Sequence, residues 1–491
     1  MHLSIGEIAN ILGSSTTRTE SAVGQYSIDS RTTQPGSVFF AIRGTRFDGH
    51  DFVAQAFDRG AVAAVVEQEF LNRSAEAHRD SLIPVRDTVL ALQQLAQAVR
   101  RKWGRQVIGV TGSTGKTTTK ELLATLLATR FAVHRSSGNL NNLYGVPLAL
   151  LALEPKHEVA VLEMAMSSRG EIARLTQIAE PEVGVVTNVA PVHLEFFDSV
   201  DSIARAKREL IENLKPPATA VLNYDDSRVR GFANGFQGRT VTFGFEDNAQ
   251  IQGVDWQKAG PGGSRLRVRG LGARASRPLL PDAGRDGSGL QERGPAADCD
   301  FELHLPGRHN AENLLAALAA ASLFAIPAAD LQRAVASFHS LHQRSEIIEL
   351  PNGTVLVDDS YNSNPLAMER MLETLAAWPS ARRRIVVAGE MLELGVSSPD
   401  LHRAVGRKCA ASGVDRLVAV QGDARYLLEG AVEAGMPLEH AQFFARAQEA
   451  AAFCRTIIRP EDLVLVKGSR GVALERIVDV LRGQGQRTTD Y

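Results

Sequence analysis

The sequence of 491 residues has few cysteines and almost no net charge. Its three cysteines, Cys299, Cys409 and Cys454, are far apart, so they lack metal-ligand spacing and a disulfide framework is not expected. The formal net charge is −2, which excludes a strong overall attraction to nucleic acid or to an anionic membrane. A binding site for an anion would therefore have to be local.

Long hydrophobic runs are also absent. No uninterrupted apolar stretch is long enough to span a bilayer, and residues 1–13 lack the basic start and apolar run of a signal peptide. We therefore expect a cytoplasmic protein with no membrane partner. The length predicts about three domains, at roughly 100–200 residues for each.

What the chain does contain is an alternation of short apolar strands and helices. Mixed strand and helix signals predict a small α/β domain over residues 1–86. Residues 87–341 alternate strands such as Val159–Glu163 with helices, which predicts a doubly wound parallel sheet. The same pattern over residues 342–491 predicts a Rossmann-like α/β domain. Ligands of such sheets bind beyond the carboxyl ends of the strands.

A segment from about residue 269 to 299 interrupts this alternation. It is rich in Gly, Arg, Pro and Ala, which predicts a flexible insertion in the central domain. Its arginines also fit a nucleic-acid patch, but basic low-complexity loops are more often simply solvated. We therefore expect no nucleic-acid partner.

The strongest local motif is a glycine-rich loop at Gly109–Thr119, between an apolar strand and a helix. That context indicates a P-loop, in which backbone N–H groups and the helix N-terminus surround a phosphate. We expect Lys116 to reach the outer phosphates of ATP and Thr117 to hold Mg²⁺. Val110 stands where the general pattern has Gly. The remaining cradle residues are predicted to be Gly112, Ser113, Thr114, Gly115 and Thr118.

A carboxylate follows the next buried strand. Glu163 ends the apolar run Val159–Glu163, where an acid is costly unless it is paired or bound to a metal. Beside a P-loop, Mg²⁺ is the natural partner, because it prefers oxygen ligands. A solvated strand end is the alternative.

The loop sequence Thr-Gly-Ser-x-Gly-Lys-Thr-Thr resembles that of the Mur ligase family, which includes muramoyl peptide ligases and folylpolyglutamate synthetases. Three further phrases resemble the family in the same order: Gly138–Asn142, Asn188–Leu194 and His309–Asn313. The resemblance implies an ATP-dependent ligase that forms an amide bond through an acyl phosphate.

The resemblance also implies residues around the reacting phosphate. It places Asn139 beside the acyl phosphate and His193 at a second metal ion. It implies that Lys207 is carbamylated and so becomes a carboxylate-like metal ligand, although Arg208 replaces the usual Gly next to it. Without the resemblance, these residues fit a turn, a polar loop and a helix surface.

For the rest of ATP, the resemblance implies residues from two domains. Asn310 and Asn313 are placed against adenine, although helix capping also explains Asn310. Arg344 is placed at the terminal phosphate and Asp359 at the ribose. ATP would then bridge the central and C-terminal domains, and closure would assemble the site.

The N-terminal domain carries segments that resemble the uridine-diphosphate-binding parts of muramoyl ligases. Ser30, Arg31 and Arg46 lie in these segments, and the arginines suit diphosphate oxygens. Each arginine alone would fit a surface charge. Folylpolyglutamate synthetases lack such a domain, so its presence argues against that branch of the family.

Three phrases resemble the family members that add D-alanyl-D-alanine to UDP-N-acetylmuramoyl-tripeptide. They span 359–365, 389–395 and 467–470, with Glu390 in place of the usual Asp. Two alternatives stay open: a family member that adds another amino acid, and a P-loop regulatory ATPase of a different class. We expect a monomer, and the resemblance implies a dipeptide site at Tyr361, Asn362 and Asn364.

Overall fold

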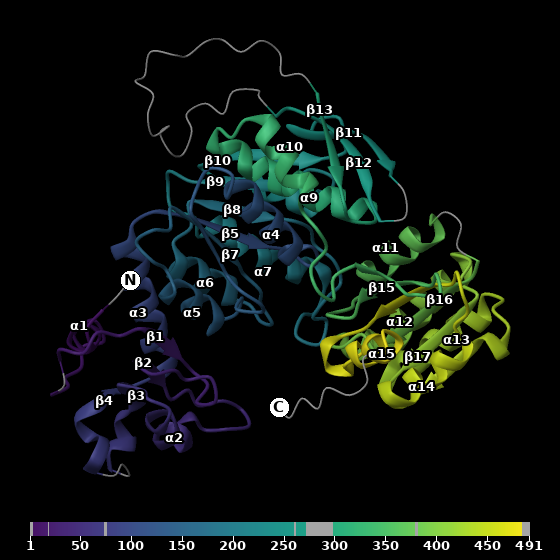
Figure 1. Cartoon of the computed structure of the whole chain (residues 1–491). Coiled ribbons are helices and arrows are strands. Elements are labelled where there is room, and N and C mark those ends of the chain that lie inside the picture. The colour runs from purple at the N-terminus through teal and green to yellow at the C-terminus, as the bar shows by residue number, and fades with distance from the viewer. Residues whose placement is uncertain are drawn as a thin grey trace.

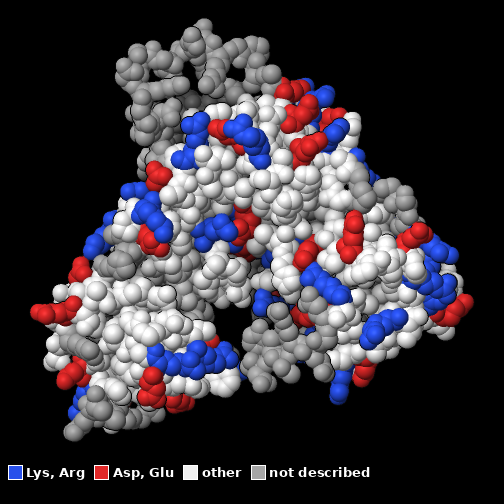
Figure 2. All heavy atoms as spheres, viewed as in Figure 1, with Lys and Arg blue, Asp and Glu red and all other residues white. Residues whose placement is uncertain are grey.

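The computed structural model describes residues 3–17, 19–72, 76–259, 262–271, 298–378 and 382–483. These residues form three β-sheets, each in its own lobe, and the lobes lie in an arc with the central one in the middle (Figure 1). The three predicted α/β units therefore correspond to three separate sheets. On the face seen in Figure 2, charged side chains of both signs are dispersed over the lobes.

The N-terminal sheet is entirely parallel, with the strand order β1-β2-β3-β4. Every residue of β2 is buried, as expected when both faces of a parallel sheet are covered. The first helix begins with a capping box, in which Ser4 and Glu7 exchange side-chain and backbone hydrogen bonds. The elements are α1 Ile5–Ile11, β1 Gln25–Ser27, β2 Ser37–Phe40, α2 Val53–Asp58, β3 Ala63–Glu67 and β4 Leu82–Val85.

The central sheet has nine strands in the order β13-β12-β11-β10-β9-β8-β5-β7-β6. The strands from β6 to β11 are parallel, as predicted, and β12 and β13 add an antiparallel edge. Burial alternates along β12, because one face of this edge meets solvent. The strands are β5 Gln106–Thr111, β6 Val133–Arg135, β7 Val159–Glu163, β8 Val183–Val186, β9 Thr219–Asn223, β10 Arg239–Gly244, β11 Ile251–Lys258, β12 Ser264–Arg269 and β13 Cys299–Leu303.

Helices cover both faces of the central sheet. Alanine and leucine dominate α9, which favours helix formation and lets this helix pack closely on the strands. One face carries α4 Lys116–Leu127, α9 Arg308–Ala321 and α10 Ala328–Ala336, and the other carries α3 Thr88–Trp103, α5 Gly145–Leu151, α6 Glu171–Ala179 and α7 Val200–Glu212. A short helix, α8 Ser227–Arg230, follows β9.

The C-terminal sheet has six strands in the order β14-β15-β19-β16-β17-β18, with only β14 antiparallel. The last strand lies between β15 and β16, so the strand order reverses there and opens a crevice at the carboxyl ends. The strands are β14 Glu346–Glu349, β15 Val355–Asp359, β16 Arg384–Gly389, β17 Arg416–Val420, β18 Ala441–Phe444 and β19 Leu463–Lys467. The helices are α11 Pro365–Ala376, α12 Ser398–Ala411, α13 Arg425–Glu433, α14 Ala447–Ile457 and α15 Glu475–Leu481.

Two further predictions from the sequence concern the insertion in the central domain and membrane-spanning segments. The insertion predicted at about 269–299 falls mainly on residues 272–297, which lie outside the described residues; β12 and β13 flank it. Among the described residues, no helix is both long enough and apolar enough to cross a membrane.

Candidate functional site

A cleft of about 490 Å³ lies between the central and C-terminal lobes. It opens at the carboxyl ends of β5 and β7 on one side and of β15 and β19 on the other, where parallel sheets place their ligands. Its walls contain most of the residues predicted for the nucleotide, the metal ions and the dipeptide. They include the P-loop from Ser113 to Thr118, Asn139, Glu163, His193, Asn310, Asn313, Arg344, Asp359, Tyr361, Asn362 and Asn364.

Two glycines allow the P-loop to approach its neighbours closely. A Cβ at Gly112 would lie 1.8 Å from Thr187 Oγ1, and one at Gly115 would lie 2.1 Å from Asn313 Oδ1. Gly115 also has a φ of +80°, which L side chains rarely adopt. The shape of the loop therefore depends on these two positions.

The loop after β8 holds the P-loop in place. Asn188 Oδ1 accepts a hydrogen bond from the Thr114 backbone N–H at 2.9 Å, and the Asn188 carbonyl accepts one from Ser113 N at 2.9 Å. Thr187 Oγ1 donates to the Thr114 carbonyl at 2.7 Å. These bonds fix the shape of the loop, and a preorganised loop binds a phosphate at a lower cost.

Lys116 lies against its own loop. Its Nζ donates to the carbonyl oxygens of Gly112 at 2.8 Å and Ser113 at 3.3 Å. Burial lowers the pKa of the Lys116 ammonium, and the nearby carboxylate of Glu163 opposes that shift. The side chain is thus held within the P-loop by dipoles that a phosphate could replace.

Glu163 forms an oxygen-rich corner of the cleft. It is only 3% exposed, and its Oε2 accepts a hydrogen bond from Thr117 Oγ1 at 2.7 Å. Its Oε1 accepts from Asn141 Nδ2 at 2.9 Å. Carboxylate and hydroxyl oxygens at this position suit Mg²⁺. Sequence reasoning singled out Asn139 in this loop and missed Asn141, whose only local signal is the Asn-rich run.

Lys207 lies behind the P-loop, on α7. It is 2% exposed, and its Nζ donates to the Gly112 carbonyl at 3.0 Å, the same oxygen that Lys116 contacts. Burial lowers the pKa of Lys207 well below its usual value, and the positive charge of Lys116 lowers it further. The structure thus brings Lys207 to the P-loop, but the amine does not line the cleft.

His193 lies at the rim of the cleft with a φ of +56°. Its Nδ1 pairs with the Glu393 carboxylate of the C-terminal lobe, and the Glu195 N–H donates to the Glu393 carbonyl at 3.1 Å. The hydrogen bond with His193 lowers the pKa of Glu393. The contact joins residues 200 positions apart, so no local sequence signal indicates that Glu393 meets the predicted metal-binding histidine.

The start of α9 brings the two predicted adenine-binding residues together. Asn310 Nδ2 donates to the Pro306 carbonyl at 2.8 Å, and Asn313 Nδ2 donates to Asn310 Oδ1 at 3.3 Å. Asn310 therefore stabilises the helix start while it lines the cleft. Sequence reasoning did not select His309, whose pKa burial lowers to about 3, so this imidazole is neutral.

Two arginines face the same aromatic ring in the C-terminal lobe. The guanidinium carbon of Arg344 lies 4.1 Å from the Tyr361 ring centroid, and that of Arg470 lies 5.2 Å from it. Both arginines line the cleft. The Tyr361 ring holds the two guanidinium groups at a place where they could neutralise the charge of a bound phosphate.

Asp359 is held by its own lobe. Its Oδ1 accepts from Ser345 N at 3.0 Å, and its Oδ2 accepts from Lys467 Nζ at 2.6 Å. Lys467 is 3% exposed and also donates to the Asn362 carbonyl at 2.9 Å. The ion pair forms because β15 and β19 are neighbours with Asp359 opposite Lys467. Lys467 was not predicted as a site residue; its signal was a lysine that ends an apolar strand.

The predicted dipeptide residues have local contacts as well. Asn364 caps α11, since its Oδ1 accepts from the Ala367 N–H at 2.9 Å. Asn362 Oδ1 accepts from the Ser363 N–H at 2.8 Å. Both residues line the cleft together with Tyr361. Helix capping explains why residue 364 is an asparagine, and the part of its side chain that faces the cleft can still contact a ligand.

The predicted uridine-diphosphate residues lie in the N-terminal lobe, away from the walls of the cleft. Ser30 Oγ donates to Gln55 Oε1 at 2.6 Å. Arg31 forms an exposed ion pair with Asp29 at 2.8 Å, and Arg46 is exposed. Figure 2 shows Lys and Arg side chains gathered on this lobe beside the opening between lobes.

The fold and the cleft define a P-loop enzyme in which two α/β lobes line a common cleft. Three family descriptions match consecutive parts of the chain: "Mur ligase family, catalytic domain" at 23–100, "Mur ligase middle domain" at 110–321 and "Mur ligase, glutamate ligase domain" at 343–470. The chain belongs to the Mur ligase family.

Relatives are similar over nearly their full length. The UDP-N-acetylmuramoyl-tripeptide--D-alanyl-D-alanine ligase of Synechocystis sp. is 35% identical, with 92% of this chain and 90% of that protein covered. The protein of that name from Escherichia coli is 32% identical, with 98% and 99% covered. A crystal structure of MurF from Acinetobacter baumannii has a TM-score of 0.83 at 27% identity, covering 98% and 99% of the two chains. MurF ligase from Thermotoga maritima in complex with ADP has a TM-score of 0.77 at 28% identity, covering 94% and 97%.

Proposed function

We propose that the chain is an ATP-dependent ligase that joins D-alanyl-D-alanine to UDP-N-acetylmuramoyl-tripeptide, a step in the synthesis of peptidoglycan precursors. The observation that carries this proposal is the single cleft in which Lys116, Glu163 and Arg344 meet, from two domains. The names and full-length similarity of the relatives support the choice of substrates.

The reaction has two steps, because a carboxylate is a poor electrophile. The tripeptide carboxylate oxygen attacks the γ-phosphorus of ATP, the bond to the β-phosphate oxygen breaks, and an acyl phosphate and ADP result. Lys116 and Arg344 stabilise the charge that spreads over the phosphoryl oxygens. The dipeptide amine then attacks the acyl carbon and loses a proton, and inorganic phosphate leaves from the tetrahedral intermediate. Asn139 would orient the acyl phosphate.

Mg²⁺ fits the corner formed by Glu163 and Thr117, because both offer oxygen ligands beside the P-loop. When bound, the ion would neutralise negative charge on the phosphate oxygens. His193 would serve a second ion through its imidazole, and its pairing with Glu393 would fix the orientation of the ring.

Carbamylation of Lys207 would complete this set of metal ligands. The neutral amine attacks CO₂, an N–C bond forms, and a proton leaves, so that an ammonium site becomes an anionic oxygen ligand. Burial favours the neutral amine that this addition requires. Removal of CO₂ should therefore lower activity, and bicarbonate should restore it.

The remaining substrate groups divide among the three domains that we assign to 1–86, 87–341 and 342–491. Ser30, Arg31 and Arg46 would bind the uridine diphosphate. Asn310 and Asn313 would contact adenine, Asp359 the ribose, and Tyr361, Asn362 and Asn364 the dipeptide. The chain would act as a monomer on these cytoplasmic substrates.

The test is the mass of the product formed from UDP-N-acetylmuramoyl-tripeptide, D-alanyl-D-alanine and ATP. We expect the coupled UDP-N-acetylmuramoyl-pentapeptide, and phosphate release that requires both acceptor and dipeptide. Sustained phosphate release with ATP alone would indicate a regulatory P-loop ATPase instead. Coupling of a single amino acid in preference to the dipeptide would indicate another activity within the family.

The variant Lys116→Ala should lower the coupling rate by roughly 10²–10³-fold or more, because a preorganised charge at the transferred phosphate is lost. Lys102→Ala is the matched control: this lysine lies on the surface of α3, in an exposed pair with Glu7 at 3.2 Å. Its activity should equal that of the original chain. Equal rates for the two variants would overturn the assignment of Lys116.

A further inference from the structure

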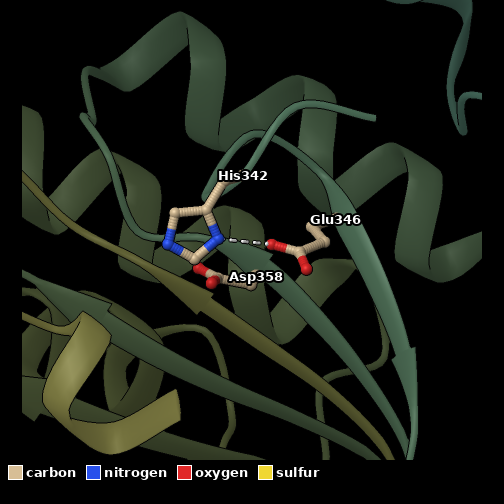
Figure 3. A group of neighbouring side chains, drawn as sticks. All are labelled: His342, Glu346 and Asp358. Carbon is tan, nitrogen blue, oxygen red and sulfur yellow. Dashed lines mark hydrogen bonds and ion pairs between the residues drawn. The ribbon is translucent and has the colours of Figure 1, made fainter. Parts of the chain in front are cut away.

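A second cluster of ligand-type side chains lies outside the nucleotide cleft. His342, Glu346 and Asp358 each offer one nitrogen or oxygen atom, and these atoms all lie within 4.8 Å of one another. Figure 3 shows the His342 ring and the two carboxylates pointing toward a common point. The cluster joins the linker before β14 to the first two strands of the C-terminal sheet.

Asp358 is the unusual member of this cluster, because it is fully buried and only half satisfied. It is 0% exposed, and its Oδ1 accepts from Ser360 N at 3.1 Å and Ser360 Oγ at 2.6 Å. Its Oδ2 is buried and has no hydrogen-bond partner. A buried carboxylate oxygen without a partner is costly, so a cation or a proton is needed there.

The other two ligands are held in position. Glu346 and Asp358 are direct partners in the antiparallel pairing of β14 with β15. Glu346 Oε1 accepts from Arg482 at 2.8 Å, while Glu346 Oε2 contacts His342 Nδ1 at 3.0 Å and accepts from Gln343 N at 3.3 Å. Such outer contacts orient metal ligands.

The charges also suit a dication. The cluster offers a dication two carboxyl groups and one imidazole, and an arginine contacts its edge. Arg482 contacts Glu346 through the oxygen that does not face His342, so the guanidinium does not fill the position between the three ligands.

We propose that His342, Glu346 and Asp358 form a binding site for a divalent transition metal of the Zn²⁺ or Co²⁺ class. One imidazole and two carboxylates favour such ions over Mg²⁺, which prefers ligands that are all oxygen. The His342 side chain is 71% exposed, so an ion can reach the site and water can complete a tetrahedral shell. Coordination uses the neutral imidazole and both carboxylates.

The position of the site predicts what the ion would do. His342 belongs to the linker between the central and C-terminal lobes, where Gln343 and Ser345 have φ values of +59° and +54°. Arg344 lies between them, and the Gln343 carbonyl accepts from Tyr361 N at 3.2 Å. A bound ion would hold this linker against the C-terminal sheet. It would thereby limit the positions that Arg344 can take in the cleft. This inference does not depend on the proposed ligase reaction.

The test uses the full chain, freed of metal with a chelator and without nucleotide. Co²⁺ is titrated while its visible ligand-field absorption is followed, and Zn²⁺ binding is measured by calorimetry. We expect one strong ion per chain and a rise in the melting temperature with Zn²⁺. His342→Ala should weaken binding by at least about tenfold and abolish the thermal shift, because a direct ligand is lost.

His339→Ala is the matched control, since His339 is an exposed histidine three positions earlier and lies against His304. It should bind Co²⁺ like the original chain. Lys116→Ala should do the same, which separates this site from the P-loop. Asp358→Asn should bind weakly, and His342→Ala, at an exposed position, gives the answer even if Asp358→Asn fails to fold.

No Co²⁺ uptake, or equal uptake by His342→Ala, would overturn the proposal and indicate that Asp358 holds only a proton. Thiolate charge-transfer bands would overturn it as well, because they would assign the ion to cysteine.

Discussion

The two junctions between lobes are formed by different kinds of contact. A continuous apolar core runs from the N-terminal sheet through α3 into the central sheet, and it includes Leu92 and Leu95, both 0% exposed. The junction of the central and C-terminal lobes relies instead on polar contacts. They include the pairs His193–Glu393 and Arg370–Glu312, the second at 2.8 Å, and the bond from Lys258 Nζ to the Ala377 carbonyl at 3.3 Å.

Because of this difference, we expect the second junction to open more easily than the first. Opening the first would expose a shared hydrophobic core, which is costly in water. Opening the second exchanges polar contacts for hydration at little net cost, as is common between domains that move. The cleft that we propose for ATP lies at the second junction, so binding of ATP would be coupled to closure.

The largest expected effect tests the apolar junction. Leu95→Ala should lower the free energy of unfolding by about 2–5 kcal/mol, because it removes buried methyl groups from the core shared by two lobes. Denaturant unfolding measures this loss, and the KM for ATP of the remaining folded protein should be unchanged. The exposed residue Leu90 on the same helix gives the control, since Leu90→Ala should change stability by less than about 0.5 kcal/mol. Similar losses for both variants would refute the shared-core interpretation.

The next effect concerns the linker of the polar junction. Arg344→Lys keeps the positive charge but loses the planar group that lies over Tyr361. We expect kcat for coupling to fall roughly tenfold, since the ammonium cannot keep the same geometry at the phosphate. Steady-state kinetics at saturating ATP measure this change. An unchanged kcat would mean that only the charge of Arg344 matters.

A smaller effect should follow from loss of the contact between His193 and Glu393. Because the Glu393 side chain is 45% exposed, solvent screening limits the pair to about 0.2–1 kcal/mol. Glu393→Gln should therefore raise the KM for ATP by roughly two- to fivefold and leave the unfolding free energy almost unchanged. Glu195→Gln, at an exposed neighbour, should leave KM as it was. A large loss of stability in Glu393→Gln would contradict the interpretation that this contact forms and breaks as the two lobes close and open.

The smallest effect is a pH dependence at the same junction. Burial raises the pKa of Glu312, and Arg370 opposes that shift. The folded state therefore retains a proton that the unfolded chain releases, so stability falls as pH rises from the usual pKa of glutamate to the raised one. Unfolding experiments at increasing pH above the usual pKa of glutamate should show this decline in the original chain. Glu312→Gln should lack it; the same decline in the variant would exclude Glu312 as its source.

The fold was largely predictable because its signals are local. Strands such as Val159–Glu163 are short apolar runs, and α3 has helical periodicity between an Asp cap and a Gly end. The antiparallel edge of the central sheet was less predictable. The alternation along β12 assigns its side chains to two faces, but its antiparallel register with β11, which shifts between Gly253 and Asp255, joins two strands and has no signal within either one.

The two halves of the candidate site differ in the same way. Lys116, Thr117 and the glycines around them form one contiguous motif, so their arrangement follows from sequence. The contacts of Lys467 with Asp359 and of Glu393 with His193 depend on strand order and on how two lobes meet. Such long-range pairs have no local signal, which is why Lys467 and Glu393 were absent from the predicted site.

In the proposed reaction, ATP phosphorylates the tripeptide carboxylate in the cleft between the central and C-terminal lobes. The most direct measurement uses UDP-N-acetylmuramoyl-tripeptide whose terminal carboxylate carries a heavy oxygen isotope, followed by mass analysis of the phosphate released with D-alanyl-D-alanine and ATP. We expect the phosphate to contain one heavy oxygen, because the carboxylate oxygen leaves bonded to phosphorus. Coupled product accompanied by phosphate with only light oxygen would contradict it.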